Sequence, residues 1–173
     1  MIPFGPKIFA CNHPTSLDPC YIYPLTDNAA ILMTQFVFDL KIVGKLVHGC
    51  GFIPVKIEGT QSRRSAFAMA INELMKGRNV LIAPEGKMSP DTNGRKARNG
   101  AVRLSAATTH PIVPIGIRHE GEVKMFQIKD QNVRFMPKGE TFIKVGFPMT
   151  YLKDTFDANT DLLMSRIARL SEP

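Results

Sequence analysis

Short apolar runs recur along the chain and are separated by segments of mixed character. Runs that are apolar at consecutive positions, and not only at alternate ones, are typical of strands buried on both faces of a parallel sheet. Such runs predict six strands, at residues 7–11, 30–33, 52–55, 79–83, 112–118 and 141–147.

Helical periodicity lies between and after these runs. It is clearest over residues 62–76, which place Phe67, Ala70, Ile71, Leu74 and Met75 on one stripe. Gly77 follows where a left-handed cap is expected. Further helices are predicted at residues 36–48 and 101–109, and at the C-terminus after a cap at Asn159 or Thr160. Alternation of strands and helices predicts an α/β fold with a mostly parallel central sheet flanked by helices.

The chain has 173 residues, with 44% hydrophobic and 21% charged, and we find no repeat, linker or low-complexity segment. These features predict one folded domain over residues 1–173. No window approaches the roughly 18 apolar residues of a spanning helix. The N-terminus lacks a secretory signal, and Cys11, Cys20 and Cys50 show no C-x-x-C spacing. We therefore expect a reducing, cytoplasmic location without a disulfide framework or structural zinc.

A net charge of +7, from 22 basic and 15 acidic residues, predicts an acidic partner. Nucleic acid, an anionic membrane surface and a phosphorylated small molecule are all acidic partners of this kind. Nucleic-acid modules usually interleave basic residues with exposed aromatic ones, whereas this chain has no Trp and its Phe residues lie mostly in apolar runs. The pattern therefore disfavours nucleic acid.

In parallel sheets, functional side chains collect beyond the C-terminal ends of the strands. The segment after the first predicted strand contains His13 and, with four residues between, Asp18. Asp18 followed by Pro19 is typical of a helix start, with Asp18 as the cap. The carboxylate can then fold back onto the imidazole and fix its tautomer, as in a general base. The alternative is an ordinary loop histidine and a simple helix cap.

The fourth predicted strand runs into Glu85 and Gly86, a hydrogen-bond acceptor beside a residue that permits close backbone approach. The next residues carry an excess of basic side chains suited to a phosphate: Lys87, Arg95, Lys96, Arg98 and Arg103. A solvated basic loop is the alternative interpretation. Elsewhere, residues 49–56 read as a turn and a strand, and Pro114 within the fifth strand predicts a sheet edge or a bulge.

Taken in order, four segments resemble the boxes of the glycerolipid acyltransferases, the lysophosphatidic acid acyltransferase family. Residues 12–18 (NHPTSLD) resemble the His-x4-Asp box, and residues 51–55 (GFIPV) the glycine-led second box. Residues 84–86 (PEG) resemble the Glu-Gly box, and residues 112–115 (IVPI) the apolar proline box. The resemblance covers roughly residues 8 to 148 and implies a glycerol-3-phosphate acyltransferase-like fold.

The chain departs from the family pattern at three places. Lys56 and Ile57 follow the second box, where the family usually has an arginine, and Lys87 and Met88 stand in place of Thr-Arg. Lysine offers a point charge instead of a bidentate fork. Family members also carry a membrane-engaging helical segment ahead of the histidine box. Only about ten residues precede it here, so that segment is expected to be missing or minimal.

The resemblance implies transfer of a fatty acyl group from acyl-CoA or acyl carrier protein to a lysophospholipid hydroxyl, first of all 1-acylglycerol-3-phosphate, to give phosphatidic acid. His13 would be the general base and Asp18 would orient it. The implied substrate-binding residues are Asn12, Gly51, Phe52, Ile53, Lys56, Glu85, Gly86, Lys87, Arg98 and Pro114. No metal or resident cofactor is expected. The protein would contact the cytoplasmic face of an anionic membrane peripherally.

Three other functions remain open at this stage. A relative that binds lysophospholipid or acyl-CoA without turnover is suggested by Ile57 and Met88 at the altered positions. A basic nucleic-acid-binding module is suggested by charge alone. A Cys11 nucleophile beside His13 would instead make the chain a thioesterase or a covalent transferase.

Overall fold

The computed structural model describes residues 5–56, 59–88, 97–128, 131–135, 138–150 and 155–173. Within these residues, six strands form the central sheet in the order β3-β2-β4-β1-β5-β8. The first five are mutually parallel, and β8 pairs antiparallel with β5. The strands are β1 (Ile8–Cys11), β2 (Ala30–Thr34), β3 (Ile53–Val55), β4 (Val80–Ile82), β5 (Ile112–Glu120) and β8 (Glu140–Val145). All six predicted strands, and the mostly parallel sheet, are confirmed.

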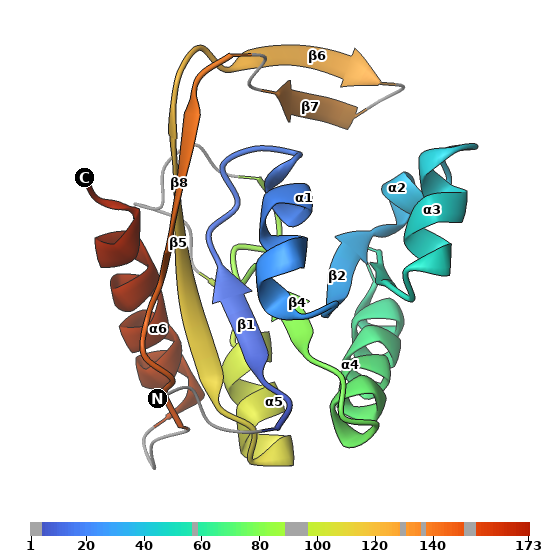
Figure 1. The fold of residues 1–173 in the computed structure, drawn as a ribbon. Coiled ribbons are helices and arrows are strands. Elements are labelled where there is room, and N and C mark those ends of the chain that lie inside the picture. The colour runs from blue at the N-terminus through green and yellow to red at the C-terminus, as the bar shows by residue number, and fades with distance from the viewer. Residues whose placement is uncertain (1–4, 57–58, 89–96, 129–130, 136–137, 151–154) are drawn as a thin grey trace.

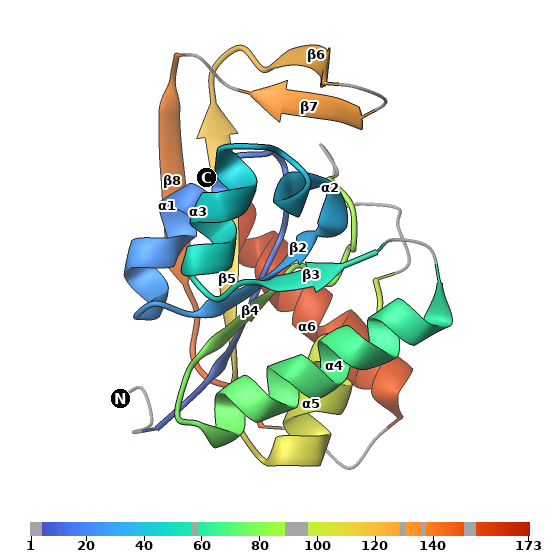
Figure 2. The same ribbon diagram turned by 90° about the vertical axis from the view of Figure 1, so that its right-hand side faces the viewer.

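Helices cover the sheet and its edges (Figure 1). They are α1 (Asp18–Ile22), the 3-10 helix η1 (Tyr23–Thr26), α2 (Gln35–Phe38), α3 (Val43–Gly49), α4 (Thr60–Met75), α5 (Gly100–Thr108) and α6 (Phe156–Ser171). The six-stranded sheet lies between two layers of helices. Helices α4, α5 and α6 pack on one face, and α1 packs on the other. In Figure 2 the short helices α2 and α3 lie beside the β2–β3 end of the sheet.

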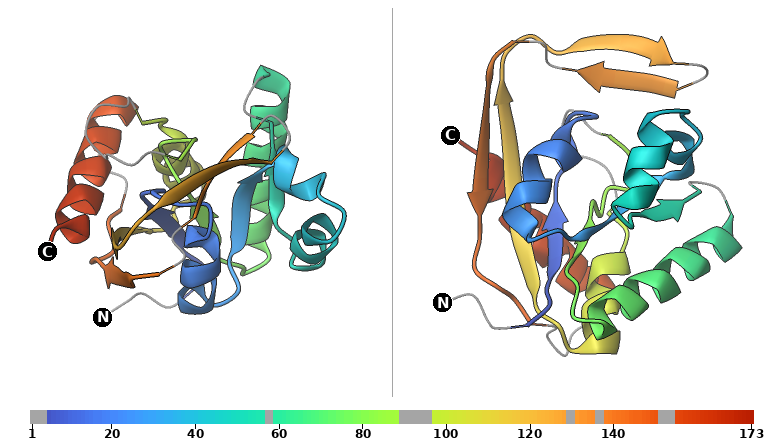
Figure 3. Two further views of the ribbon diagram at one scale, coloured as in Figure 1. Left: turned by 90° about the horizontal axis from the view of Figure 1, so that it is seen from above. Right: turned by 45° about the vertical axis from the view of Figure 1, so that its right-hand side comes forward.

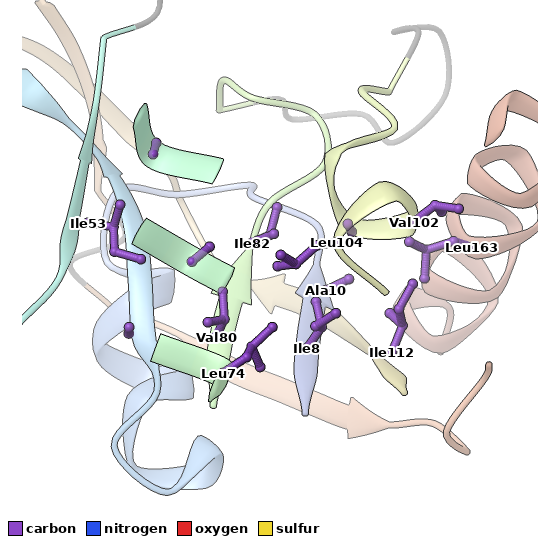
Figure 4. Packing of buried hydrophobic residues seen from close by; sticks show 14 of the residues in the cluster. Ile8, Ala10, Ile53, Leu74, Val80, Ile82, Val102, Leu104, Ile112 and Leu163 are labelled. Atoms are coloured by element: carbon purple, nitrogen blue, oxygen red, sulfur yellow. The ribbon is translucent and has the colours of Figure 1, made fainter. Parts of the chain in front are cut away.

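Residues of β1, β2 and β4 alternate between two apolar clusters. Ile8 and Ala10 of β1 pack with residues of α4, α5 and α6, whereas Phe9 and Cys11 pack with Ile22 of α1. Figure 4 shows the larger cluster, with side chains of β4 and β5 beside those of the three helices. Both faces of β1 are thus buried, which explains why its sequence is a continuous apolar run.

The predicted helix at residues 62–76 is confirmed as α4, and Gly77 has the expected left-handed φ of 86°. Its buried stripe is formed by Ala66, Ala70 and Leu74, while Met75 is 70% exposed, so the prediction for Met75 was wrong. The helix predicted at 101–109 is confirmed as α5.

The single helix predicted over residues 36–48 was wrong, because the chain forms α2 and α3 with a turn between them. A Cβ on Gly44 would lie 2.1 Å from the carbonyl oxygen of Phe38, so the two helices approach each other at a distance that only glycine permits. This close approach, between residues six apart in the chain, accompanies the break, and helical periodicity does not indicate it.

Two predicted helix caps were also wrong. The hydroxyl of Thr155 caps α6 by accepting from the N–H of Ala158, and Asn159 and Thr160 lie buried inside that helix. Leu17 holds the cap position of α1, which places Asp18 within the first turn. The carboxylate of Asp18 is consequently not used as a cap and is available for other contacts.

Pro114 lies in β5 between β1 and β8, so the edge-strand alternative was wrong and the bulge alternative holds. Ile115 pairs with Val145, and Ile112 pairs with Met149. Between these two pairs, residues 113–114 of β5 lie opposite residues 146–148, which follow β8. The segment after β8 thus contains one extra residue, which defines a bulge. Pro114 lies at this irregularity, where its missing N–H interrupts no regular ladder.

An antiparallel hairpin of β6 (Lys124–Ile128) and β7 (Gln131–Phe135) was not predicted. It extends from the upper end of β5 above the loop after β1, as the views in Figures 1 and 3 agree. The N–H of Ser16 donates to the carbonyl of Arg134, and the N–H of Arg134 donates to the hydroxyl of Ser16. The hairpin is thereby fastened to the loop that carries His13.

Candidate active site

The C-terminal ends of β1 and β4 lie side by side because the two strands pair in parallel. The loops that follow them carry His13, the predicted general base, and Glu85, a predicted substrate-binding residue. The hydroxyl of Ser16, in the first loop, donates to the sulfur of Met88, in the second, at 3.0 Å. The fold thus brings together two segments that are about 70 residues apart in the chain.

His13 and Asp18 form a direct pair. Nδ1 of His13 lies 2.8 Å from Oδ2 of Asp18. The His13 side chain is 22% exposed, whereas that of Asp18 is 1% exposed. A buried carboxylate at Nδ1 fixes the tautomer in which Nδ1 carries the proton, and leaves Nε2 free to accept one. The prediction that the carboxylate folds back onto the imidazole is confirmed in its geometry.

Among the described residues, Asp18 accepts from four groups. The N–H of Thr15 donates to Oδ2 at 2.8 Å, and the Thr15 hydroxyl donates to Oδ1 at 2.6 Å. Nε2 of His119, on β5, lies 2.8 Å from Oδ1. Burial alone raises the pKa of the Asp18 carboxyl, but the contacts with His119, His13 and Thr15 outweigh it, and the pKa is lowered. Asp18 is therefore ionised at neutral pH.

Asn12 fixes the start of the same loop. Its amide nitrogen donates to the carbonyl of Ile117 at 2.8 Å, and its amide oxygen accepts from the Ile117 N–H at 2.7 Å. A side chain that both donates and accepts is needed for this double contact with the β5 backbone, and asparagine provides it. Asn12, at 3% exposure, therefore acts as a structural tie beneath His13.

Glu85 and Gly86 lie in the turn that follows β4. Glu85 is buried, and its charge together with that of Asp18 acts on the Cys11 thiol. Gly86 has φ 69°, and a Cβ there would lie 3.1 Å from Nε of Arg98. The Arg98 guanidinium thus lies directly against the Glu-Gly turn, and the backbone N–H of Arg98 donates to the carbonyl of Pro84. This places a cation beside the turn that follows β4.

The family model for Acyltransferase matches residues 1–118. The chain belongs to the Acyltransferase family. It is 26% identical over 105 residues to a 1-acyl-sn-glycerol-3-phosphate acyltransferase of Borreliella burgdorferi. That match covers 60% of this chain and 42% of the relative, so the chain spans less than half the length of the curated protein.

The fold is similar to the crystal structure of PlsC, the 1-acyl-sn-glycerophosphate (LPA) acyltransferase of Thermotoga maritima, with a TM-score of 0.72 and 17% identity. This match covers 99% of the chain and 68% of PlsC. The expected acyltransferase-like α/β fold is therefore confirmed. In this Acyltransferase family member, the His-x4-Asp and Glu-Gly boxes follow β1 and β4 at one end of the sheet, whereas the other two boxes lie largely within β3 and β5.

Four of the predicted substrate-binding residues serve the scaffold of this acyltransferase domain. Gly51, with φ 65°, lies against Arg78, whose guanidinium donates to the Gly51 carbonyl at 3.0 Å. The Phe52 ring packs edge-on against Tyr23. Ile53 and Pro114 are buried within their strands. The side chains of Ile53 and Pro114 support the site from within the sheet, whereas Gly51 and Phe52 lie just before β3.

The predicted basic residues are distributed over several places. Lys56, after β3, and Lys87, after Gly86, are both exposed. Arg103, on α5, lies 5.9 Å from the ring centres of Phe67 and Phe156, so it belongs to the helical face. Ile57, Arg95 and Lys96 lie outside the described residues.

Cys11 is not placed for covalent catalysis. Its side chain is 4% exposed within the apolar cluster of β1 and α1. Burial raises the pKa of the Cys11 thiol well above its usual range, and the charges of Asp18 and Glu85 raise it further. A protonated, buried thiol is a poor nucleophile. The structure thus contradicts the thioesterase alternative that relied on Cys11.

Sequence reasoning missed His119 and Thr15 as partners of Asp18, and Thr141 as a partner of His119. His119 contacts Asp18 across 101 residues of chain, and Thr141 reaches His119 from β8. One signal was available: a histidine at the C-terminal end of an apolar strand, where polar residues of a parallel sheet gather. The partners of His119, however, depend on how β1, β5 and β8 pair in the sheet, which the sequence does not show.

Within the described ranges, no three or more His, Cys, Asp or Glu side chains gather as a group that could hold a metal ion. Over the same part of the chain, none of the helices has the length and apolarity required to cross a membrane.

Proposed function

We propose that this Acyltransferase family member transfers a fatty acyl group from a thioester to the free hydroxyl of 1-acylglycerol-3-phosphate, giving phosphatidic acid. The observation that carries the proposal is the buried, ionised Asp18 held 2.8 Å from Nδ1 of the partly exposed His13. The names of the matched proteins, both lysophosphatidic acid acyltransferases, support the choice of acceptor.

The proposed reaction uses His13 as a general base and then as a general acid. Its Nε2 removes the proton of the acceptor hydroxyl as the oxygen attacks the thioester carbonyl. Asp18 stabilises the imidazolium that forms. When the tetrahedral intermediate collapses, the C–S bond breaks and the thiol sulfur takes the proton from His13. No acyl-enzyme forms, which agrees with the buried state of Cys11.

The remaining polar groups would bind the substrates. Glu85 and Gly86 would position the glycerol part of the acceptor, and Arg98, beside Gly86, would face its phosphate. Lys56 and Lys87, both exposed, would contribute charge to the phosphate of the acceptor or of CoA. We propose no metal or resident cofactor, because the thioester supplies an acyl group that is already activated.

Acceptor-dependent release of thiol tests the proposal directly. With palmitoyl-CoA as donor, we expect addition of lysophosphatidic acid to raise the rate of thiol release by at least about 100-fold over hydrolysis. The measurement is thiol titration, corrected for the protein's three cysteines. Palmitoyl-acyl carrier protein and glycerol 3-phosphate, tested in parallel, identify the donor and acceptor classes.

Other outcomes would replace the proposal. Release that does not depend on the acceptor would indicate a thioesterase. Binding of lysophosphatidic acid or palmitoyl-CoA without turnover would indicate a binding-only relative. Salt-sensitive binding of duplex DNA without turnover would indicate a nucleic-acid module.

We also propose that the protein contacts the anionic cytoplasmic face of a membrane through the start of α3. Ile42 and Leu46 there are 84% and 66% exposed, and Val43 is 43% exposed. Lys41 and Lys45 lie in the same short segment and are also exposed. Adjacent apolar and basic side chains are suited to an anionic lipid surface, where each lysine contributes about 1 kcal/mol. The three free cysteines agree with a reducing compartment.

Vesicle binding checks this surface. Replacing Ile42 and Leu46 together by serine is expected to lower binding to phosphatidylglycerol-containing vesicles by about tenfold or more, because apolar surface no longer enters the interface. Co-sedimentation measures the bound fraction. Met75→Ser, at a 70% exposed position on α4, is the matched control. Equal binding by the double variant and the control would refute the assignment.

A further inference from the structure

His119 lies near the end of β5 and is buried, with 4% of its side chain exposed. Its Nε2 lies 2.8 Å from Oδ1 of Asp18, and its Nδ1 lies 2.9 Å from the hydroxyl of Thr141. Thr141 is the residue that pairs with His119 across β5 and β8. The ring of Tyr21, on α1, lies 6.0 Å away, centre to centre. Contacts from the α1 region and from β8 thus fix the orientation of this imidazole.

The two oxygens of Asp18 are divided between the two histidines. Oδ2 contacts His13, whereas Oδ1 contacts His119. Thr15 contributes one contact to each oxygen. A carboxylate that is fixed only through one oxygen can turn about its Cβ–Cγ bond, because this terminal torsion is broad. Oδ1 is held by the Thr15 hydroxyl and by His119, and these two contacts together restrain that rotation and keep Oδ2 directed at Nδ1 of His13.

The hydrogen bonds assign the protons of the His119 ring. Asp18 is ionised and only accepts, so Nε2 of His119 carries a hydrogen. In the neutral ring Nδ1 is then the acceptor, and the Thr141 hydroxyl donates to it. The chain Thr141–His119–Asp18–His13 therefore runs from the edge strand β8 to the exposed imidazole, with a paired polar atom at each link.

We propose that His119 is a positioning residue for acyl transfer: it holds Asp18 in the orientation that keeps His13 ready to accept the hydroxyl proton. The inference rests on the proposed function, in which His13 is the base. His119 contacts no reacting atom, and it acts only through Asp18. A purely structural tie between β5 and the loop after β1 would need the same contacts but would have no specific effect on turnover.

Two substitutions separate these roles. His119→Leu removes the donor to Asp18, and we expect kcat to fall on the order of tenfold to 100-fold, because misplacement of a catalytic group has effects of this size. The KM values for palmitoyl-CoA and lysophosphatidic acid are expected to change by less than about twofold. In His119→Gln the amide nitrogen replaces Nε2 as the donor, and its oxygen accepts from Thr141. This variant is expected to keep kcat within about threefold of the wild type.

The same substitutions in a His13→Ala background provide the sharper readout. If His119 acts through His13, His119→Leu has no further effect there, so the two changes are not additive. A residue that merely supported the fold would lower the residual activity by the same factor in both backgrounds. Circular dichroism and thermal unfolding of each variant report whether the protein is folded.

The inference is overturned if folded His119→Leu keeps the wild-type kcat, if folded His119→Gln loses as much as His119→Leu, or if the effect persists without His13. Should His119→Leu not fold, Thr141→Val replaces it, with an expected fall in kcat of about twofold to fivefold. Unchanged kcat in that variant would equally overturn the inference.

A spectroscopic measurement distinguishes this failure from a failure of the proposed function. The Nδ1 proton of His13, bonded to Asp18, is observable by imidazole ¹H–¹⁵N correlation whether or not the protein transfers acyl groups. We expect its exchange with water to accelerate by about tenfold in His119→Leu and to remain near the wild-type rate in His119→Gln. Unchanged exchange in His119→Leu overturns the positioning role, whereas absence of transfer by the wild type overturns only the proposed function.

Discussion

Replacing His13 by alanine is expected to reduce acceptor-dependent thiol release by about 10²- to 10⁴-fold, the usual contribution of a general base. The fold should survive, because Asp18 keeps its contacts with Thr15 and His119. Most of the loss should appear in kcat, since the substrate-binding groups on the Glu85–Gly86 turn are unchanged. Steady-state kinetics with palmitoyl-CoA and lysophosphatidic acid measure both quantities.

His48→Ala is the matched control for this experiment. His48 is exposed on α3 and packs edge-on against Phe38, outside the contacts that hold His13. The His48→Ala variant should keep the wild-type rate of acceptor-dependent thiol release within about twofold, because substitutions at exposed positions usually have small effects. Retention of more than about one tenth of the rate by His13→Ala would exclude His13 as the base.

The strands were predictable because their signal is local and redundant. β1 presents Ile8 and Ala10 to one cluster and Phe9 and Cys11 to the other, so every position must be apolar. The hairpin of β6 and β7 carries no such signal. Met125 and Phe126 are exposed like their polar neighbours, so no burial pattern marks these strands.

The pair of His13 and Asp18 was predictable because both residues belong to one short loop and helix start. Its supporting contacts were not. The contact between His119 and Asp18 depends on which strand lies next to β1, and on the register of β5. The spacing of residues in the sequence reveals neither the strand next to β1 nor the register of β5. An isolated histidine in a strand is also equally compatible with an ordinary core position.

Glycine roles were the least accessible to sequence reasoning. Gly51 was assigned to substrate binding, but the structure places it against Arg78, which donates to the carbonyls of Asn28, Cys50 and Gly51. Gly44, in α3, likewise lies against the carbonyl of Phe38, at the end of α2, where one continuous helix was predicted. In both cases the need for glycine arises from a close contact in the folded chain, which hydrophobic periodicity does not identify.

Asp18→Asn is expected to lower kcat by about 10³- to 10⁴-fold while leaving most hydrogen bonds in place. The asparagine oxygen can accept from His13 and Thr15 at the position of Oδ2. Its nitrogen can donate to the Thr15 hydroxyl and to Nε2 of His119, provided that the His119 proton moves to Nδ1 and is donated to Thr141. The fall in kcat would then result from the missing negative charge and not from disruption of the hydrogen bonds around residue 18.

The pH dependence of stability gives an independent check on Asp18. Because its pKa is lowered in the folded protein, the carboxylate contributes stability that is present above the unfolded pKa of about 4 and is lost as the pH falls through the folded pKa. Asp18→Asn lacks this titration, so its deficit in unfolding free energy, expected to be about 1–3 kcal/mol at neutral pH, should shrink below about pH 4. Asp27→Asn, at an exposed position with φ 50° that asparagine also adopts, is the control. Denaturant unfolding from pH 7 to pH 3 measures the difference, and a deficit that stays constant over this range would contradict the ionised, hydrogen-bonded state of Asp18.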